Sequence, residues 1–361
     1  MIQDSYNFSA GPSVLPSEVK LQAIEEMATN GSNGFSVMEI SHRSDRFREI
    51  LNHAEESLRR LMGVPEGYRI LFISGGASQH FSMIPHNFLP EDESADYLVT
   101  GYWGDKAAKE AEKCGKVRRL FDGSSDGFRR LPDSDETIST ADSRYLHYCS
   151  NETIGGLEFD FIPASEAPLI CDASSNILSK RIPIEQHSLI YAGAQKNIGP
   201  SGISLAVISD DFIGRALPNR LSCLDYRLFS EHRSMPNTPN TWGIFIIGLV
   251  CDWIESQGGI DGIEASNQRK ASLIYGVLDE FPEFYRGHVE REGRSRMNIT
   301  FSLPNDEIEK VFLNEAEEVG LMGLKGHRSV GGVRASMYNA FPVRGAERLA
   351  EFMVDFHSKH S

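Results

Sequence analysis

The sequence predicts an α/β protein with a large domain built on a mostly parallel β-sheet and a smaller α+β domain at its C-terminal end. From about residue 16 to residue 261, short apolar runs alternate with amphipathic helical stretches, which is typical of repeated strand–helix–strand units. Five of these runs end in small or polar residues, as strands do at the ligand-binding edge of an open α/β sheet. Beyond residue 261 long helices alternate with single strands, which indicates a second domain.

The strands of the large domain are predicted from apolar runs rich in β-branched and aromatic residues. In chain order they cover residues 68–74, 95–100, 144–149, 167–172, 188–196 and 202–209. Gly75 and Gly76 follow the first strand and introduce a helix over residues 79–88, and residues 101–115 supply a loop and a second helix. The most apolar window, residues 242–254, is 13 residues long, which is too short to span a bilayer and predicts a buried helix.

The smaller domain is predicted from five further elements. Helices are expected over residues 259–281, 306–321 and 345–360, and strands over residues 294–303 and 331–339. We therefore expect a large domain over residues 16–261, and a small domain over residues 262–361 together with the N-terminal segment 1–15.

Composition and charge exclude several classes of protein. The 361 residues are 40% hydrophobic and 24% charged, which is typical of a globular chain. The formal net charge is −15 and no long run of Lys and Arg occurs, so neither nucleic acid nor a membrane is an expected partner. The first residues lack a basic segment followed by an apolar core, so we expect no secretory signal. Five cysteines without paired spacing predict reduced thiols in a cytoplasmic protein and no metal site.

Two charged residues stand at the ends of neighbouring predicted strands. Lys196 closely follows the apolar residues 189–194, and Asp172 ends the preceding strand, 24 positions earlier. Because ligands bind beyond the carboxyl ends of parallel strands, both side chains are expected to face one pocket. A buried ammonium without a partner is costly, so either a nearby group pairs with Lys196 or chemistry removes its charge.

Sequence motifs narrow the chemistry of this pocket. The motifs G-x-G, G-x-x-x-x-G-K-[ST], H-E-x-x-H and G-x-S-x-G are all absent, which leaves dinucleotide binding, P-loop chemistry and two hydrolase classes without support. The remaining interpretation is a pyridoxal phosphate enzyme, in which a lysine holds the cofactor as a Schiff base and a carboxylate keeps the pyridine nitrogen protonated. Lys196 and Asp172 suit these two tasks. The helix start at residues 75–78 suits the phosphate, and Trp103 at a strand exit suits stacking on the ring.

Each of these residues also has an ordinary interpretation. A lysine after a strand is often a surface residue, and Asp172 in the sequence DASSN could cap a helix. Trp103 alone is more often a core residue than a stacking platform. Thr153 in the sequence SNET would serve in any turn.

The chain resembles the phosphoserine aminotransferases, a class-V family of fold-type-I pyridoxal phosphate-dependent enzymes, over essentially its whole length. The segments that carry the resemblance, in chain order, are NFSAGPSVLP, VMEISHRS, GGASQ, GYW, HYCSNETIGG, DASSNILS, YAGAQKNIGPSG, SMPNTPNT, SRMN and LKGHRSVGGVRASMYNA. A lone GPSG would carry almost no weight, whereas ten segments in one order are highly specific.

The resemblance implies a seven-stranded, mostly parallel sheet flanked by helices, and it assigns roles to named residues. Lys196 holds the cofactor as a Schiff base, and Asp172 pairs with its pyridine nitrogen. Further cofactor contacts are implied for Ala77, Ser78, Trp103, Thr153 and Gln195, and, across the interface of a homodimer, for Asn237 and Thr238. Substrate contacts are implied for Ser9, His327, Arg328 and Arg334, and, across the same interface, for His42 and Arg43.

The implied activity is a reversible transamination. 3-Phosphohydroxypyruvate and L-glutamate give O-phospho-L-serine and 2-oxoglutarate in serine biosynthesis, and Lys196 also moves the proton from the substrate Cα to C4′ of the cofactor. A second activity on 4-phosphohydroxy-L-threonine in pyridoxine biosynthesis is expected as well. One departure concerns the substrate: some family members carry an arginine after three glycines where this chain has Gly76, Ala77 and Ser78, which removes one substrate-binding cation.

Two other interpretations stay open at this point. A related desulfurase would need a cysteine on a mobile loop near the substrate, and none of the five cysteines is evidently placed there. A cofactor-binding module without turnover would keep the fold, but Lys196, Asp172 and Arg334 are all present, which argues against it. A colour change driven by an amino acid would separate an enzyme from such a module.

Overall fold

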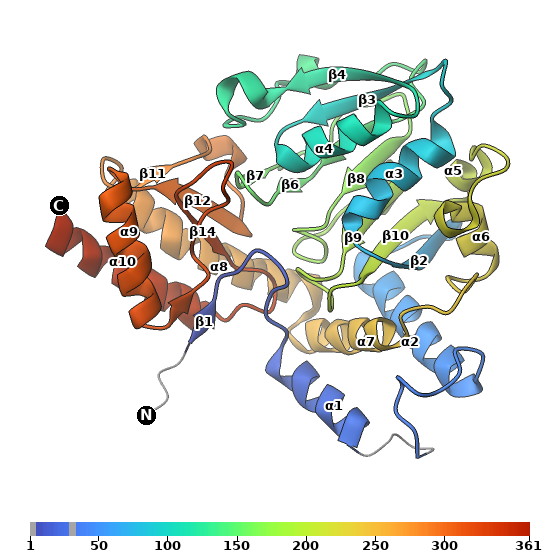
Figure 1. Cartoon of the computed structure of the whole chain (residues 1–361), viewed down its shortest axis with the longest axis horizontal. Coiled ribbons are helices and arrows are strands. Elements are labelled where there is room, and N and C mark those ends of the chain that lie inside the picture. Colours follow the sequence, from blue (N-terminus) through green and yellow to red (C-terminus); the bar gives the residue numbers. More distant parts are fainter. Residues whose placement is uncertain (1–4, 29–33) are drawn as a thin grey trace.

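The computed structural model describes residues 5–28 and 34–361, which form a large lobe and a smaller lobe (Figure 1). In the described part of the chain, a seven-stranded sheet crosses the large lobe. In spatial order its strands are β2 (Tyr68–Ser74), β10 (Ile203–Ser209), β9 (Leu189–Gly193), β8 (Leu169–Asp172), β5 (Leu146–Cys149), β3 (Ser94–Val99) and β4 (Lys116–Asp122). β10 is antiparallel to both of its neighbours and the other pairs are parallel, so the predicted mostly parallel sheet is confirmed.

The edge strand β4 was not predicted from the sequence. Its sequence, KVRRLFD, carries two adjacent arginines that obscure the apolar pattern of a strand. Arg118 pairs with the fully buried Asp96 of β3 at 2.6 Å, and Arg119 pairs with Asp105 at 2.9 Å. These cations therefore fasten the edge of the sheet to the neighbouring elements, and charged residues on an edge strand also discourage pairing with other chains.

Helices cover both faces of this sheet, because alternate residues of a strand point to opposite faces. On β10, Leu205 and Val207 join the core packed by α2 and α7, whereas Ala206 and Ile208 join the core packed by α3, α4 and α6. The helices of the large lobe are α1 (Ser17–Ala28), α2 (Asp45–Met62), α3 (Ala77–Phe88), α4 (Tyr102–Ala111), α5 (Asp210–Gly214), α6 (Tyr226–Glu231) and α7 (Thr241–Ser256).

The smaller lobe contains three long helices and an antiparallel sheet. Its main elements are α8 (Gly259–Glu280), α9 (Asp306–Glu318), α10 (Val343–His360), β11 (Arg286–Gly287), β12 (Asn298–Ser302) and β14 (Val333–Ser336). The N-terminal strand β1 (Tyr6–Asn7) pairs in parallel with β13 (Leu321–Met322), so the start of the chain belongs spatially to this lobe. Phe8 is completely buried in the core of this lobe, which anchors the segment.

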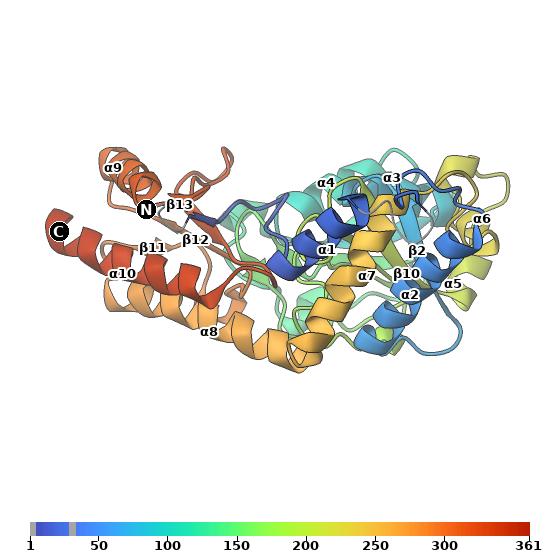
Figure 2. The same cartoon turned by 90° about the horizontal axis from the view of Figure 1, so that it is seen from below.

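Helix α8 joins the two lobes. Ile260 and Ile263 near its start pack in the core of the large lobe, whereas Ile274 and Leu278 near its end pack in the core of the smaller lobe. Figure 2 shows α8 running from the end of α7 to lie beside α10. We retain the division into residues 16–261 and residues 262–361 with 1–15 as a proposal.

The predicted buried helix at residues 242–254 is present as α7. Asn240 caps its first turn, with the side-chain oxygen accepting a hydrogen bond from the N–H of Gly243 at 2.8 Å. No single helix in residues 5–28 and 34–361 is long and apolar enough to cross a membrane, although α7 and α8, which meet at 79°, together satisfy the length and composition of a bent span.

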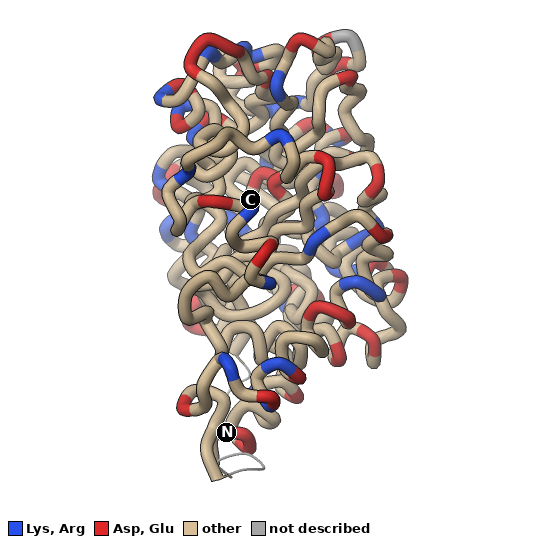
Figure 3. Tube along the Cα trace, turned by 90° about the vertical axis from the view of Figure 1, so that its right-hand side faces the viewer, with Lys and Arg blue, Asp and Glu red and all other residues tan. Residues whose placement is uncertain are grey.

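The remaining elements are short and lie in the connections. They are β6 (Asn151–Glu152), β7 (Leu157–Glu158), and the 3-10 turns η1 (Gly123–Asp126), η2 (Ser134–Thr137), η3 (Ile184–Gln186), η4 (Ser222–Leu224) and η5 (Arg291–Gly293). On the side of the molecule drawn in Figure 3, acidic and basic positions are interspersed along the chain and do not gather into one basic stripe.

Candidate active site

A small cavity of about 110 Å³ lies where β5, β8 and β9 end and where α3 and α4 begin. It brings together many of the residues singled out in the sequence. Its lining consists of Gly76, Ala77, Ser78, Phe81, Trp103, Cys149, Asn151, Thr153, Asp172, Ser174, Ser175, Gln195 and Lys196. The expectation that Asp172 and Lys196 share one pocket is therefore met by the geometry.

Strand pairing brings Asp172 and Lys196 together. Asp172 is the last residue of β8, and its partner in the parallel strand β9 is Tyr191. β9 ends at Gly193, and the chain then turns so that Gln195 and Lys196 face the cavity. A Cβ atom at Gly193 would lie 2.7 Å from Oε1 of Gln195, so a larger residue there would displace the Gln195 side chain from its present position.

Lys196 occupies the centre of the site. Its Nζ donates a hydrogen bond to Oγ1 of Thr153 at 2.5 Å and lies 5.9 Å from the centre of the Trp103 ring. Desolvation lowers the pKa of the Lys196 amine, and the negative charge of Asp172 opposes that shift. The amine is thus held close to the acceptor and the ring, with its neutral form favoured relative to a free lysine.

The N-terminal segment fastens the backbone of Lys196. Oγ of Ser13 donates a hydrogen bond of 2.5 Å to the carbonyl oxygen of Lys196, and the N–H of Ser13 donates to Gln195 at 2.9 Å. Gly11 of the same segment is so close that a Cβ atom there would lie 3.4 Å from Cγ of Lys196. This segment therefore connects the smaller lobe, through β1, to the centre of the cavity.

Asp172 supplies a buried carboxylate beside Lys196. Only 3% of the residue is exposed, and Oδ1 accepts a hydrogen bond from the N–H of Ser174 at 2.9 Å. Burial raises the pKa of Asp172, although the contact with Ser174 and the charge of Lys196 oppose the shift. A carboxylate in this environment is suited to pair with a cationic group that enters the cavity.

Glu152 is a second buried carboxylate, and sequence reasoning missed it. It lies at the end of β6 and accepts hydrogen bonds from the backbone N–H groups of Trp103 and Gly104. Burial raises the pKa of Glu152 to about 7, although these two donors oppose the shift. The sequence SNET points only to Thr153, and the contact between Glu152 and helix α4 spans almost fifty positions, so no local signal indicates it.

Several polar groups around the cavity have no partner within the described chain. Nε1 of Trp103, Oδ1 of Asn151 and Oε1 of Gln195 are buried without a hydrogen bond. Helix α3 begins at Ala77 after Gly76, and no side chain caps this N-terminus. Buried polar groups normally find partners, and an uncapped helix N-terminus attracts anions. The cavity therefore fits a ligand that has a flat polar ring and an anionic group.

Basic side chains from the smaller lobe stand near this cavity. Arg334 of β14 is half-buried, and its guanidinium has no hydrogen-bond or ion-pair partner among residues 5–28 and 34–361. The positive charge of Arg334 is felt at Lys196 and at His327. His327 lies 5.7 Å from the ring of Tyr102 on α4, and Arg328 beside it is exposed. Three basic groups thus gather in residues 327–334.

The other expected substrate and cofactor residues do not line this cavity. Ser9 lies in the N-terminal segment, where its N–H donates to Asn7 at 3.0 Å. His42 and Arg43 lie in the turn before α2, and Asn237 and Thr238 lie in the loop before α7. Arg43, Asn237 and Thr238 are exposed. These positions leave the cavity of a single chain incomplete if all the expected contacts are made.

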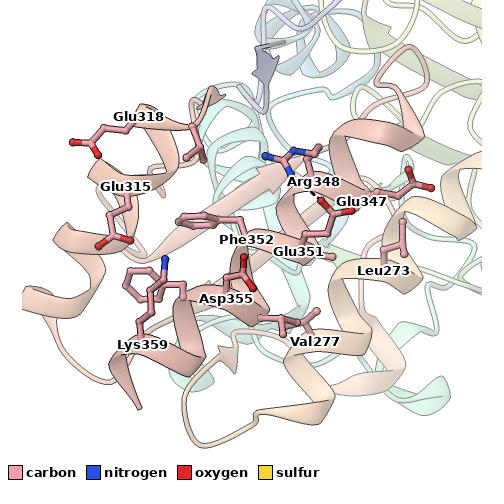
Figure 4. Close-up of a pocket in the computed structure, with 14 residues that line it drawn as sticks. Leu273, Val277, Glu315, Glu318, Glu347, Arg348, Glu351, Phe352, Asp355 and Lys359 are labelled. Carbon is pink, nitrogen blue, oxygen red and sulfur yellow. Dashed lines mark hydrogen bonds and ion pairs between the residues drawn. The ribbon is translucent and has the colours of Figure 1, made fainter. Parts of the chain in front are cut away.

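A larger hollow than this cavity lies elsewhere in the described part of the chain. It measures about 970 Å³ and is formed by α8, α9 and α10 of the smaller lobe. Figure 4 shows Glu315 and Glu318 of α9 across the hollow from Phe352, Asp355 and Lys359 of α10. None of the residues predicted from the sequence as site residues lines it, so size does not identify the functional site here.

Known proteins match this chain over almost its whole length. The family described as "Aminotransferase class-V" matches residues 5–349. A phosphoserine aminotransferase of Laribacter hongkongensis is 47% identical over 355 residues, which cover 98% of this chain and 99% of that protein. The structure of a phosphoserine aminotransferase from Bacillus circulans subsp. alkalophilus matches with a TM-score of 0.96 and 43% identity, covering 99% of both chains.

A third match concerns a structure whose description names a ligand. The phosphoserine aminotransferase of Trichomonas vaginalis, described as PLP bound, matches with a TM-score of 0.89 and 37% identity over 97% of this chain and all of that one. The predicted fold type, a large domain with a mostly parallel sheet and a smaller α+β domain, is confirmed by these structural matches.

Proposed function

The chain belongs to the class-V aminotransferase family, and on this premise we propose that it is a pyridoxal phosphate-dependent phosphoserine aminotransferase. Its substrates would be 3-phosphohydroxypyruvate and L-glutamate, and its products O-phospho-L-serine and 2-oxoglutarate. The observation that carries the choice of a phosphorylated substrate is the group of three basic residues at 327–334 beside the Lys196 cavity. A substrate with both a carboxylate and a phosphate needs more cations than a simple amino acid does.

The residues that line the cavity offer a suitable partner for each part of pyridoxal phosphate. The uncapped start of α3 at Ala77 and Ser78, with Gln195, would hold the phosphate. The ring of Trp103 would stack on the pyridine ring, and Thr153 would lie beside it. Asp172 would pair with the pyridine nitrogen, because a buried carboxylate favours a protonated ring.

The chemistry divides between the cofactor and Lys196. Pyridoxal phosphate, when bound, supplies the carbonyl group that takes up the amino group and the ring that withdraws electrons from the substrate Cα. The lowered pKa of Lys196 leaves more neutral amine, which can accept the proton from the substrate Cα. Thr153 keeps the amine in place through the hydrogen bond of 2.5 Å.

The substrate contacts are assigned by charge. Arg334, half-buried and without a partner in the described chain, would bind the α-carboxylate that both substrates carry. His327 and Arg328 would bind the phosphate that only one substrate carries. Ser9 would approach the substrate from the N-terminal segment.

We further propose a homodimer with shared sites. Arg43, Asn237 and Thr238 are exposed in one chain, as residues that serve the site of a partner would be. Apolar side chains on α1 are also exposed, including Leu21 at 67% and Ile24 at 62%, and a second copy of the chain would cover them. His42 and Arg43 would then reach the substrate phosphate, and Asn237 and Thr238 the cofactor phosphate, of the neighbouring site. A cytoplasmic location is proposed with this activity.

Separate half-reactions test the proposed substrates. The purified protein loaded with pyridoxal phosphate is mixed with glutamate, O-phosphoserine, 4-phosphohydroxy-L-threonine, alanine or cysteine, and the loss of the visible absorption of the cofactor is followed. Glutamate and O-phosphoserine should discharge this absorption fastest, and the phosphorylated threonine derivative should follow. A preference for alanine over both would contradict the proposal.

Release of sulfide from cysteine would favour the desulfurase interpretation. The raised pKa of the buried Cys149 thiol disfavours that interpretation.

A further inference from the structure

Glu152 holds the N-terminus of helix α4 from a distant part of the sequence. Its Oε1 accepts a hydrogen bond from the N–H of Gly104 at 2.7 Å, and its Oε2 accepts one from the N–H of Trp103 at 3.1 Å. The residue has 0% exposure, and the charge of Lys196 acts on it more weakly than the two backbone donors do. Burying a carboxylate is costly, so the two backbone donors carry most of the compensation.

The helix backbone comes unusually close to this carboxylate. A Cβ atom at Gly101 would lie 2.4 Å from Cδ of Glu152, and one at Gly104 would lie 3.2 Å from its Oε1. Gly101 has extended backbone, with φ of 178°, so space and not conformation requires glycine there. The two glycines therefore let the helix and the carboxylate meet without an intervening side chain.

The two segments that Glu152 joins each contribute a residue to the cavity wall. Trp103 lies on α4, with its ring centre 5.9 Å from Nζ of Lys196. Thr153 directly follows Glu152, and its Oγ1 lies 2.5 Å from the same nitrogen. The Glu152 carboxylate thus fixes the distance between α4, which carries the Trp103 ring, and the segment that carries the Thr153 hydroxyl.

We propose that Glu152 is a positioning residue of the cofactor cavity. It holds the Trp103 ring and the Thr153 hydroxyl at fixed positions relative to Lys196. The proposal rests on the cofactor-binding role assigned to this cavity under the proposed function. An ordinary helix cap would stabilise α4 without affecting the ring. Asn305 is an ordinary cap of this kind, on helix α9 in the smaller lobe. Its side-chain oxygen accepts a hydrogen bond from the N–H of Ile308 at 3.0 Å.

The test compares Glu152→Gln with the matched control Asn305→Ala at pH 8. Glutamine keeps the size of the side chain but turns an NH2 group toward one of the two backbone donors. The chain has three tryptophans, so Trp242→Phe and Trp253→Phe are introduced first, which leaves Trp103 as the fluorescent reporter. The probes are the fluorescence anisotropy and acrylamide quenching of Trp103 in the cofactor-free protein, and the equilibrium dissociation constant of pyridoxal phosphate.

Glu152→Gln should lower the anisotropy of Trp103, increase its quenching, and weaken binding of pyridoxal phosphate roughly tenfold, as expected for the loss of a hydrogen bond to a charged group. Asn305→Ala should lower the urea midpoint without moving either probe. Equal values for Glu152→Gln and Asn305→Ala would overturn the proposal and leave Glu152 as a stabilising cap only.

A second measurement applies if Glu152→Gln does not fold. In the wild-type cofactor-free protein, hydrogen exchange at the amides of Trp103 and Gly104 should be as slow as in the body of α4, because both donate to Glu152. Exchange as fast as at an uncapped helix N-terminus would overturn the proposal. These measurements use no amino-acid substrate, so they succeed or fail independently of whether the chain turns over O-phosphoserine.

Discussion

The amine nitrogen of Lys196 donates a hydrogen bond of 2.5 Å to the hydroxyl oxygen of Thr153, so two segments more than forty positions apart meet at the centre of the cavity. A hydroxyl that accepts from an ammonium stabilises the charged form of the amine. Desolvation acts in the opposite direction and lowers the pKa of Lys196. The reactivity of the amine therefore depends on the balance of these two effects.

Thr153→Val should shift this balance. Valine keeps the shape of threonine but accepts no hydrogen bond, so the pKa of Lys196 should fall further below its ordinary value of 10.5. Only the neutral amine attacks the cofactor carbonyl, so the rate at which the cofactor-free protein takes up pyridoxal phosphate should reach its plateau at a lower pH in the variant. Stopped-flow absorbance across pH 6–10 measures this, and a plateau that moves to higher pH would refute the role of Thr153.

Lys196 itself should carry the cofactor. Borohydride reduction of the loaded protein, followed by digestion and mass spectrometry, should find the cofactor on the peptide that contains Lys196. Lys270 is the informative comparison, because it is also buried but donates to the carbonyl oxygens of Met337, Tyr338 and Phe341. A label on Lys270 or on any other lysine would contradict the assignment.

Substitutions of the three basic residues of the smaller lobe, His327, Arg328 and Arg334, should differ in which substrate they affect. His327→Ala and Arg328→Ala should weaken O-phosphoserine by roughly tenfold or more and affect glutamate much less, because a charge-assisted contact is worth about 1.5–3 kcal/mol. Arg334→Ala should weaken both substrates, since each has an α-carboxylate. The two half-reactions, measured separately for each variant, give the comparison, and an equal loss for both substrates in all three variants would rule out this division.

The position of Lys196 and Asp172 followed from the sequence, but the position of Glu152 did not. Strand ends are marked by local patterns, and the carboxyl ends of neighbouring parallel strands meet at one edge of the sheet, so two residues 24 positions apart could be placed in one pocket. The partners of Glu152 lie on a helix almost fifty positions away. Only the tertiary structure brings that helix to it, and its neighbour Thr153 gave no hint of a buried carboxylate.

The fold was predictable where burial sets the pattern. β10 has apolar residues on both faces and reads as a continuous apolar run, so its limits in the structure, Ile203–Ser209, are close to those expected. β4 lies at the sheet edge and uses Arg118 and Arg119 to pair with carboxylates of neighbouring elements, so it lacks that run. The residues expected to act across a dimer interface could be assigned only through the resemblance, because nothing in the pattern of one chain marks a contact with another.

Glu152 should also make the stability of the cofactor-free protein depend on pH. Its pKa is raised from 4.5 to about 7 in the folded protein, so the folded state binds more protons than the unfolded state between these values. Stability contributed by the protonated form is present below pH 4.5 and is lost as the pH rises through 7. The shift corresponds to about 3 kcal/mol.

Glu152→Gln cannot titrate at this position, so it provides the comparison. The free energy of unfolding of wild type relative to Glu152→Gln should fall between pH 5 and pH 8, as measured by urea denaturation. Asp172, Lys196 and Cys149, whose charges interact with Glu152, are present in both proteins, so their own titration largely cancels in the difference. A difference that stays constant across this range would show that Glu152 is ionised throughout.

The shared site of the proposed dimer can be tested by mixing two inactive variants. Lys196→Ala removes the amine of one site, and Arg43→Ala removes a cation that each chain would lend to its neighbour. When the two are unfolded and refolded together in equal amounts, half of the dimers are mixed. In a mixed dimer one site has both lesions and the other has none, so activity should return to roughly a quarter of wild type.

If both residues acted within one chain, every site would keep one lesion and mixing would restore nothing. Light scattering must confirm dimers, and Arg43→Ala must be inactive alone. Under those conditions, no recovery of activity on mixing would disprove the shared site.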